Sequence, residues 1–266
     1  MTRSQTLPDL ALPELTLPGP RGAAAARPTS RAAAPGREPH RSFAVYYGHE
    51  RLNKLRGFRT VVLQPAHYTP AEILWLRGQG VTPLAYLSVG EDPSPEPSAW
   101  SRQCRNPDWG TWYVKIGHAG WTARLHADAG ASLQHFSGLL LDTLDGTALF
   151  PSDRSPLLRT LRSLRQRHPG AYLLANRGFD LLPEMARYVD GVLLESFTTS
   201  WEDGYRKLRP HELAYTAEML RRVRAQGLDA YALDYACTPQ QRRAAQVRAR
   251  AMGVSTFVSV RELTAL

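Results

Sequence analysis

The chain has 266 residues, of which 43% are hydrophobic and 21% charged, as in a protein with one large domain or two small ones. Its formal net charge is +9, but the arginines are scattered over helical segments without a nucleic-acid-binding motif, so we expect a solvated basic surface and no nucleic-acid partner. No run approaches the ~18 apolar residues of a membrane helix, and Cys104 and Cys237 belong to no Cys/His cluster, so we expect neither a membrane span nor a zinc site.

The first 41 residues differ in composition from the rest, since they are rich in proline, alanine and arginine and contain no aromatic residue. Such a segment cannot bury enough apolar surface to offset the entropy lost on ordering. We therefore expect a disordered tail over residues 1–41 and one folded domain over residues 42–266. The apolar run Ala23–Ala26 is shorter than the roughly 7–15 residue core of a signal peptide, so the sequence as given indicates a cytoplasmic location.

From residue 43 onward, short apolar runs alternate with helical stretches. The runs are almost continuously apolar, which is typical of parallel strands buried on both faces. The predicted strands are Phe43–Tyr47, Thr60–Gln64, Pro83–Ser88, Gly138–Asp142, Ala171–Asn176, Gly191–Glu195, Ala230–Asp234 and Thr256–Ser259.

Helical patterns fill the intervals between these runs. Thr69 and Thr238 each precede a proline, the pattern of an N-cap followed by proline at the first helical position. The predicted helices are 70–79, 119–136, 154–168, 179–188, 210–226 and 238–252, with short helices near 49–56 and at the C-terminus. Eight strand–helix repeats predict an α/β fold, a single (β/α)8 barrel of the TIM type. An open doubly wound sheet is the alternative, but it often carries a glycine-rich phosphate loop, which this sequence lacks.

Polar and aromatic residues follow the apolar runs. In a barrel these strand ends share one rim, which is where barrel enzymes bind their substrates. Buried carboxylates cost several kcal/mol each unless they are paired, so their repeated placement at strand ends favours a site. The residues placed at this rim are Tyr46, Tyr47, Gln64, His67, Tyr68, Glu91, Asp142, Asn176, Glu195, Asp234 and Tyr235.

Each rim residue taken singly also has a structural explanation. Asp142, Glu195 and Asp234 can serve as helix caps or ion-pair partners, and His67 and Tyr68 can pack at the rim. The joint arrangement carries the functional interpretation. Two carboxylates that end the fourth and sixth strands can converge to the ~5–5.5 Å that a retaining glycosidase needs.

The segment 91–121, between the third and fourth strands, is unusually long and rich in aromatic residues, among them Trp100, Trp109 and Trp121. Long loops on the catalytic rim are usually functional. Its tryptophans can either stack on sugar faces or form a cluster that holds the loop in place.

An ordered set of short motifs at the strand ends resembles a known family. The motifs are Tyr46-Tyr47-Gly48, Gln64 followed by His67-Tyr68, Ala85–Glu91, Asn106–Trp109, Leu140–Thr143 with Asp145, Asp190–Phe197 and Leu233–Tyr235. The set is similar to the endo-α-1,4-polygalactosaminidases, glycoside hydrolase family 114, over about residues 43–263.

This resemblance implies hydrolysis of α-1,4-linked galactosamine-containing polysaccharide without a metal or organic cofactor. It implies that Asp142 is the nucleophile and Glu195 the general acid/base, with the other rim residues and Trp109 binding substrate. Family members usually act outside the cytoplasm, whereas this sequence shows no export signal. The family usually has an aspartate at the end of the second strand, where this chain has Gln64.

Two other functions fit parts of the sequence. A non-catalytic carbohydrate-binding barrel would keep the aromatic cleft, and Gln64 supports that alternative. A barrel enzyme for a small anionic metabolite would suit the arginines, but it needs a phosphate site near the last two strands, where no glycine-rich loop occurs. A cationic polysaccharide also requires an acidic cleft in this basic protein, and the acids that can provide it are Glu91, Asp142, Asp145, Glu195 and Asp234.

Overall fold

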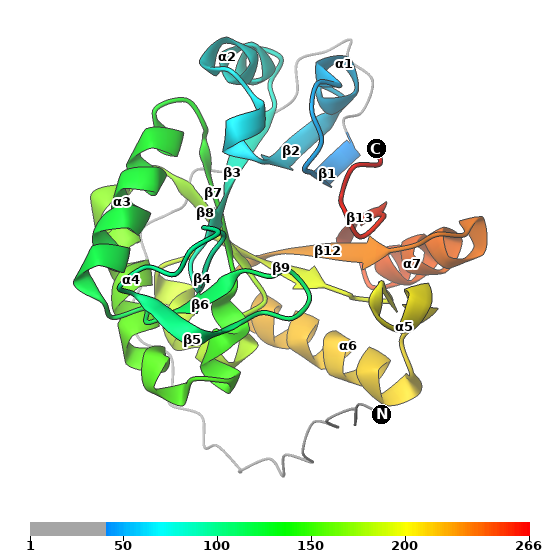
Figure 1. The fold of residues 1–266 in the computed structure, drawn as a ribbon. Helices are drawn as coiled ribbons and strands as arrows, with labels where there is room; N and C mark the ends of the chain where they lie inside the picture. Colours follow the sequence, from blue (N-terminus) through cyan, green and yellow to red (C-terminus); the bar gives the residue numbers. More distant parts are fainter. Residues whose placement is uncertain (1–40) are drawn as a thin grey trace. The chain divides into compact units, whose positions relative to one another are not determined.

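A computed structural model describes residues 41–266. Residues 1–40, which make up all but the last residue of the expected disordered tail, lie outside the described part of the chain. The central sheet has eight parallel strands in the order β1-β2-β3-β7-β8-β9-β12-β13, and β13 lies beside β1, so the sheet forms a nearly closed barrel (Figure 1). The predicted α/β barrel is confirmed.

All eight predicted strands are present, with small shifts at their ends. Their bounds are β1 (Arg41–Tyr46), β2 (Phe58–Leu63), β3 (Thr82–Ser88), β7 (Gly138–Asp142), β8 (Tyr172–Asn176), β9 (Gly191–Glu195), β12 (Asp229–Tyr235) and β13 (Ser255–Ser259). Leu139, Leu140 and Leu141 of β7 are fully buried or nearly so, as expected for a strand covered on both faces. The barrel is joined near its open seam by the Tyr47 N–H, which donates to the Leu263 carbonyl at 2.9 Å.

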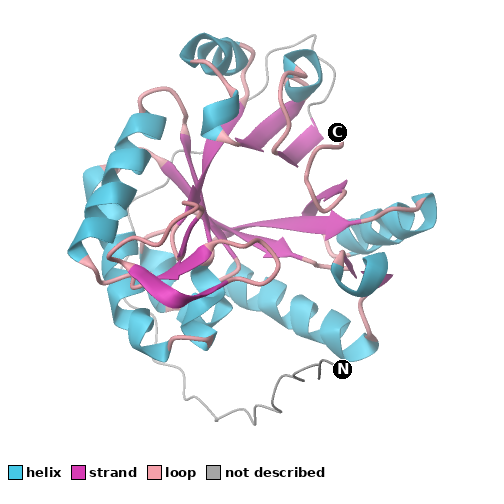
Figure 2. Ribbon diagram, viewed as in Figure 1, coloured by secondary structure: helices cyan, strands magenta, loops and turns pink. Residues whose placement is uncertain are grey.

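Helices surround the strands on the outside of the barrel (Figure 2). The helices are α1 (Leu52–Leu55), α2 (Pro70–Gly78), α3 (Ala119–Leu133), α4 (Arg154–Arg167), α5 (Glu202–Tyr205), α6 (Pro210–Ala225) and α7 (Pro239–Ala251). Thr69 caps α2 in a reciprocal capping box with Glu72, and Thr238 does the same for α7 with Gln241. No helix in the described residues is long and apolar enough to span a membrane.

Two of the predicted helices were wrong. The segment 179–188 contains two short 3₁₀ turns, η4 (Phe179–Leu181) and η5 (Glu184–Arg187), in place of one helix. Pro183 lies between them, and a proline inside a helix lacks the N–H for the ladder and clashes with the preceding turn. The described residues after β13 form a turn and an irregular segment, where a short C-terminal helix was expected.

The segment between β3 and α3 is a small sheet of its own. It contains β4 (Glu91–Asp92), β5 (Ser101–Arg105) and β6 (Trp112–Val114), paired antiparallel in the order β4-β6-β5. We call residues 91–114 the insertion. Figure 1 shows the insertion, in green, in front of the barrel strands.

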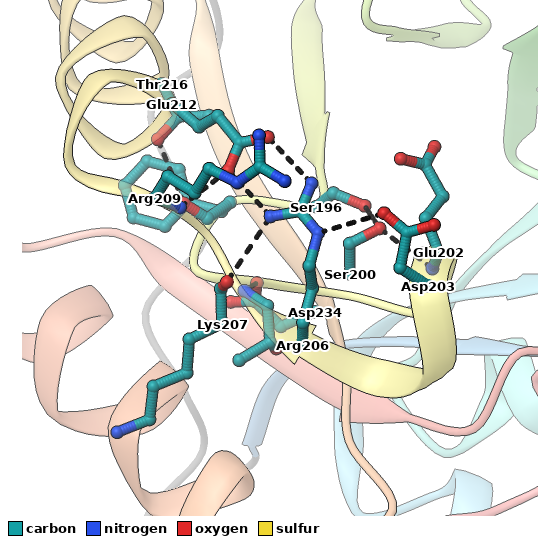
Figure 3. A network of polar contacts seen from close by, with 12 residues as sticks. Ser196, Ser200, Glu202, Asp203, Arg206, Lys207, Arg209, Glu212, Thr216 and Asp234 are labelled. Atoms are coloured by element: carbon teal, nitrogen blue, oxygen red, sulfur yellow. Dashed lines mark hydrogen bonds and ion pairs between the residues drawn. The ribbon is translucent and has the colours of Figure 1, made fainter. Parts of the chain in front are cut away.

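A second short hairpin follows β9. It pairs β10 (Thr199–Ser200) with β11 (Arg206–Lys207), and α5 lies between them. Arg206 lies between Glu212, at 2.7 Å, and Asp203, at 3.5 Å, and so ties the hairpin to the start of α6 (Figure 3).

Candidate active site

A cavity of about 470 Å³ opens at the C-terminal ends of the barrel strands. Four of its lining residues, Asp142, Asn176, Glu195 and Tyr235, are the last residues of β7, β8, β9 and β12. These four strands are neighbours in the barrel, so the backbone register places the four side chains next to one another.

Asn176 joins the two carboxylates. Its Nδ2 donates to Asp142 Oδ1 at 2.7 Å and to Glu195 Oε2, also at 2.7 Å. The two oxygens therefore cannot be more than twice that distance apart. This limit matches the roughly 5–5.5 Å of retaining glycosidases and excludes, for these oxygens, the roughly 6.5–9.5 Å of inverting ones.

Each carboxylate also accepts a hydrogen bond from its own tyrosine. The Tyr86 hydroxyl donates to Asp142 Oδ2 at 2.8 Å, and the Tyr235 hydroxyl donates to Glu195 Oε1 at 2.5 Å. Burial and the neighbouring acids raise the pKa of both tyrosines well above the ordinary value, as they do for Tyr47, whose ring meets the Tyr86 ring edge-on at 5.2 Å. The tyrosines therefore stay protonated and act as donors.

The electrostatic environment raises the pKa of Glu195. Burial is the larger cause, and the negative charge of Asp142 is the next. Hydrogen bonds from Tyr235 and Asn176 oppose this shift because they stabilise the carboxylate. A raised pKa lets Glu195 hold a proton closer to neutral pH, as a general acid must.

Eight of the residues that the sequence placed in the site line this cavity. They are Tyr47, Gln64, Glu91, Trp109, Asp142, Asn176, Glu195 and Tyr235. Three of the five acids expected in the cleft, Glu91, Asp142 and Glu195, line the cavity together with Glu262, and Arg261 is the one cation among the described lining residues. Asp145 lies outside the lining and pairs with Arg177 at 2.8 Å.

The other four predicted site residues lie outside the lining. Tyr46 alternates with Tyr47 along the chain, so it faces the other way, and its hydroxyl donates to the His49 carbonyl. His67 stacks on His49 with ring centroids 3.9 Å apart. Tyr68 donates to the carbonyls of Gly48 and Glu50 and lines a separate cavity beside α2 and α3.

Asp234 alternates with Tyr235 on β12 and is fully buried behind the cavity wall. Its Oδ1 accepts the backbone N–H groups of Thr198 and Thr199, at 2.5 and 2.8 Å. These residues follow Glu195 closely in the chain, so Asp234 holds the turn after β9 from behind. Burial raises the pKa of Asp234 to about 6, although the two backbone donors oppose the shift.

The insertion supplies the rest of the cavity wall. Glu91 accepts hydrogen bonds from Asn106 Nδ2 at 3.0 Å and from the Thr111 hydroxyl at 2.5 Å. Trp109 is 54% exposed and lies beside Trp201, with the Arg261 guanidinium over both rings.

The tryptophans of the segment 91–121 divide between the two predicted roles. Trp121 of α3 is buried and donates to the Val89 carbonyl at 2.8 Å, and Trp100 donates to Asp92 within the insertion at 2.7 Å. The centroids of the two rings are 6.0 Å apart, so this pair packs the insertion against α3. Of the four tryptophans in this segment, Trp109 alone lines the cavity, and Trp112 lies under the Arg105 guanidinium at 4.0 Å.

Several lining residues were not among the predicted site residues, including Tyr86, Asn106, Thr111, Thr143 and Arg261. Tyr86, Asn106 and Thr143 lie in motifs that carry the family resemblance, and Tyr86 also lies two positions before Ser88 on a strand, so it shares the face of that strand end. Thr111 and Arg261 carry no comparable signal. Cys104 and Cys237 are free and exposed, and the described residues contain no group of three or more His, Cys, Asp or Glu side chains that could hold a metal ion.

Comparison with known proteins gives one family. The model of glycoside-hydrolase family GH114 matches residues 23–266. A search of the curated proteins finds no match.

Two solved structures are similar over most of the chain. The glycoside hydrolase domain of PelA from Pseudomonas aeruginosa has 33% sequence identity and a TM-score of 0.78, with 85% of this chain and 96% of that domain covered. Ega3 from Aspergillus fumigatus, solved in complex with galactosamine, has 12% identity and a TM-score of 0.67, with 85% of this chain and 94% of that one covered. At this identity, the similarity to Ega3 reports the fold.

Proposed function

The chain belongs to glycoside-hydrolase family GH114, and from that premise we propose that it cleaves α-1,4-linked galactosamine-containing polysaccharide by a retaining mechanism. Asp142 is the nucleophile and Glu195 the general acid/base in this proposal. The observation that carries it is the Asn176 side chain, whose single amide group contacts both carboxylates and so keeps them within reach of one glycosidic bond.

In the first step the Asp142 carboxylate attacks the anomeric carbon while the proton of Glu195 passes to the leaving glycosidic oxygen. The carbon–oxygen bond of the substrate breaks, and an ester forms between Asp142 and the sugar. Asp142 is suited to attack because Tyr86 and Asn176 donate to its two oxygens and hold the side chain in place.

In the second step Glu195 acts as a base. The ester removes the negative charge of Asp142, which is one of the causes that raise the pKa of Glu195. The pKa of Glu195 therefore falls in the intermediate, and its carboxylate takes a proton from the water that attacks the anomeric carbon. The ester bond between that carbon and Asp142 breaks as the water adds, and Asp142 is released as a carboxylate. The environment thus supports both roles of one residue.

The test uses Asp142→Asn and Glu195→Gln with a panel of α-1,4-galactosaminans and related polymers, and products are read by mass spectrometry. The wild-type chain is expected to release oligosaccharides, and each variant to lose at least about a thousandfold in kcat, on the scale of lost nucleophilic or acid catalysis. Thermal unfolding checks that the variants remain folded.

The stereochemistry gives a second measurement. Proton NMR of the first product formed should show the α-anomer, because two displacements retain the configuration. Wild-type turnover in both variants would refute the assignment of the two carboxylates. Binding by the wild-type chain without any product would indicate a carbohydrate-binding barrel.

A further inference from the structure

Three strands of the barrel are followed directly by a non-glycine residue in the left-handed backbone conformation. Thr143 after β7 has a φ of 63°, Arg177 after β8 a φ of 55°, and Ser196 after β9 a φ of 53°. Within residues 41–266, no residue of this kind directly follows the other five barrel strands. A non-glycine residue rarely adopts this conformation because its Cβ crowds the backbone, so three of them on adjacent strands need an explanation.

The same three strands end in the residues that form the site. Asp142 ends β7, Asn176 ends β8 and Glu195 ends β9, and Asn176 Nδ2 donates to an oxygen of each carboxylate. A left-handed residue thus follows every member of this hydrogen-bonded trio. Unfavourable backbone conformations that persist in a folded protein cluster at functional sites, so the coincidence indicates that the conformation serves the site.

The left-handed turns keep bulky side chains away from the two acids. In a strand that continued, the residue two positions further on would lie on the same face as the acid. Those residues are Leu144 and Phe197, which are fully buried and do not line the cavity. Phe197 instead lies under the Arg248 guanidinium of α7, at 4.1 Å. The chain therefore leaves the strand direction one residue after each acid, and the carboxylates of Asp142 and Glu195 stay open to the cavity.

Side chains that lie outside the cavity lining hold two of the three turns. Asp145 pairs with the Arg177 guanidinium at 2.8 Å and accepts the Gly178 N–H at 2.9 Å. Asp234 accepts the backbone N–H groups two and three positions after Ser196. Both acids were expected in the cleft, and these contacts give them a different role, because each fastens the chain just after a site residue.

The third turn is fastened through Thr143 itself. Its hydroxyl oxygen accepts the Gly90 N–H at 2.6 Å, and its hydroxyl donates to the Asp142 carbonyl, also at 2.6 Å. A Cβ on Gly90 would lie 2.6 Å from the Thr143 carbonyl oxygen, so this close approach requires glycine. All three turns are therefore held by contacts that offset the cost of the left-handed conformation.

We propose that Thr143, Arg177 and Ser196 are positioning residues, whose left-handed backbone ends each strand at its site residue and points that side chain into the cavity. This inference rests on the proposed function, because it takes Asp142 and Glu195 as the reacting groups. The backbone conformation is the feature that acts. A residue that tolerates a positive φ therefore supports turnover at these positions, and one that resists it does not.

Ser196 is the position for the first test, because the hydrogen bond of its hydroxyl within residues 41–266 is a long one, 3.4 Å to Ser200 Oγ. Ser196→Gly allows the left-handed conformation freely, Ser196→Val disfavours it, and Ser196→Pro forbids it by fixing φ at about −65°. Kinetics on a partly de-N-acetylated α-1,4-galactosaminan should give a kcat within about threefold of wild type for Ser196→Gly. The expected fall is about tenfold for Ser196→Val and at least about a hundredfold for Ser196→Pro, with KM within about twofold in Ser196→Val.

Asp203 provides the matched control, because it is also left-handed, with a φ of 51°, and lies on α5 outside the cavity lining. Asp203→Val should lower the midpoint of thermal unfolding as Ser196→Val does and leave kcat within about twofold. An equal fall of kcat in Asp203→Val would assign the effect to lost stability and overturn the inference. A wild-type kcat in Ser196→Val would also overturn it.

Position 143 tests the same rule and guards against misfolding of the Ser196 variants. Thr143→Val and Thr143→Gly both lose the hydroxyl that accepts the Gly90 N–H. Valine has the shape of threonine, but glycine tolerates the positive φ. Thr143→Gly is therefore expected to retain about tenfold more kcat than Thr143→Val. The reverse order would overturn the inference.

A measurement on the free protein separates this inference from the proposed function. Carbon NMR titration of the Glu195 carboxyl, assigned with Glu195→Gln, reports whether this side chain keeps its buried place beside Asp142. Its raised pKa is expected to persist in Ser196→Gly and to fall toward the ordinary value in Ser196→Val. That fall, with no product from the wild-type chain, refutes the proposed function alone. Product release by the wild-type chain, with kcat and the Glu195 pKa unchanged in Ser196→Val, refutes the positioning inference alone.

Discussion

The two sides of the cavity are built in different ways. On one side Asp142, Asn176 and Glu195 end three adjacent strands, and their spacing follows from the hydrogen-bonded register of the sheet. On the other side the insertion is held against the barrel by side chains, including the Arg102–Asp153 ion pair at 2.6 Å and the contact of Arg261 with the Asp108 carbonyl.

The two sides of the cavity are therefore suited to different functions. A strand end is fixed by many backbone hydrogen bonds, so it suits groups that must be placed within a fraction of an ångström during a reaction. The insertion depends on a few side-chain contacts, so it can change with little effect on the barrel. We therefore expect the strand side to control the rate of the chemical step and the insertion to control the binding of substrate.

The largest expected effect concerns Asp234, the strand residue that holds the turn after Glu195. Its pKa is raised from the ordinary 3.8 to about 6, so between these values the folded state binds more protons than the unfolded state. Its contribution to stability is therefore present at low pH and is lost as the pH rises through about 6. At pH 7 ionised Asp234 lowers the free energy of unfolding by about 3 kcal/mol relative to a neutral group.

Asp234→Asn tests this expectation, because asparagine keeps the acceptor for Thr198 N–H and Thr199 N–H and remains neutral. Its amide nitrogen would replace Asp234 Oδ2, which accepts no hydrogen bond within residues 41–266, and it could donate to the neighbouring Thr198 hydroxyl. Urea unfolding from pH 4 to pH 7 should show the variant gaining up to about 3 kcal/mol on the wild type. Parallel pH dependence of the two proteins would contradict the buried ionised state.

A smaller effect is expected for the tyrosine that contacts Glu195. Tyr235→Phe removes a donor that stabilises the Glu195 carboxylate, so the pKa of Glu195 should rise further. Because the general acid must be protonated, activity is lost as pH rises through this pKa. The alkaline limb of the kcat/KM profile should therefore move to higher pH, and kcat should fall about tenfold.

Tyr172→Phe is the matched control for that variant. Tyr172 begins β8 at the opposite end of the barrel, where its hydroxyl donates to Asp229 at 2.7 Å. The Tyr172→Phe variant should leave the alkaline limb of the kcat/KM profile at the wild-type pH. If the alkaline limb does not move in Tyr235→Phe, or moves equally in Tyr172→Phe, then the ionisation seen in that limb does not belong to Glu195.

The strand side was the part that sequence could predict. Continuous apolar runs such as Leu139–Leu141 indicate buried parallel strands, and a strand that ends in Asp142 or Glu195 places its carboxylate at the common rim. The errors among the strand-end residues came from the alternation of side chains along a strand. Tyr46 and Tyr47 are adjacent, as are Asp234 and Tyr235, and the sequence did not show which member of each pair faces the cavity.

The insertion was less predictable, because long-range side-chain contacts fix its shape. Nothing local indicates that Arg261 will lie over Trp109, or that Glu91 will accept from Thr111. The helix expected at 179–188 failed for a local reason, since Pro183 interrupts an otherwise helical composition. Both cases show that apolar periodicity predicts the elements of the barrel better than the connections that complete its site.

The smallest expected effect lies in the insertion and tests the comparison most directly. Trp109 is half-exposed at the cavity mouth, where its ring can stack on a sugar beyond the reacting unit. Trp109→Ala should raise KM about threefold to tenfold, as the loss of one aromatic contact implies, and leave kcat within about twofold. The control is Trp75→Ala, since Trp75 is comparably exposed on α2 and lies outside the cavity lining. Steady-state kinetics on one polymer measures both constants. A fall in kcat as large as the rise in KM would mean that the insertion also positions the reacting groups. In that case the two sides of the cavity would not have separate functions.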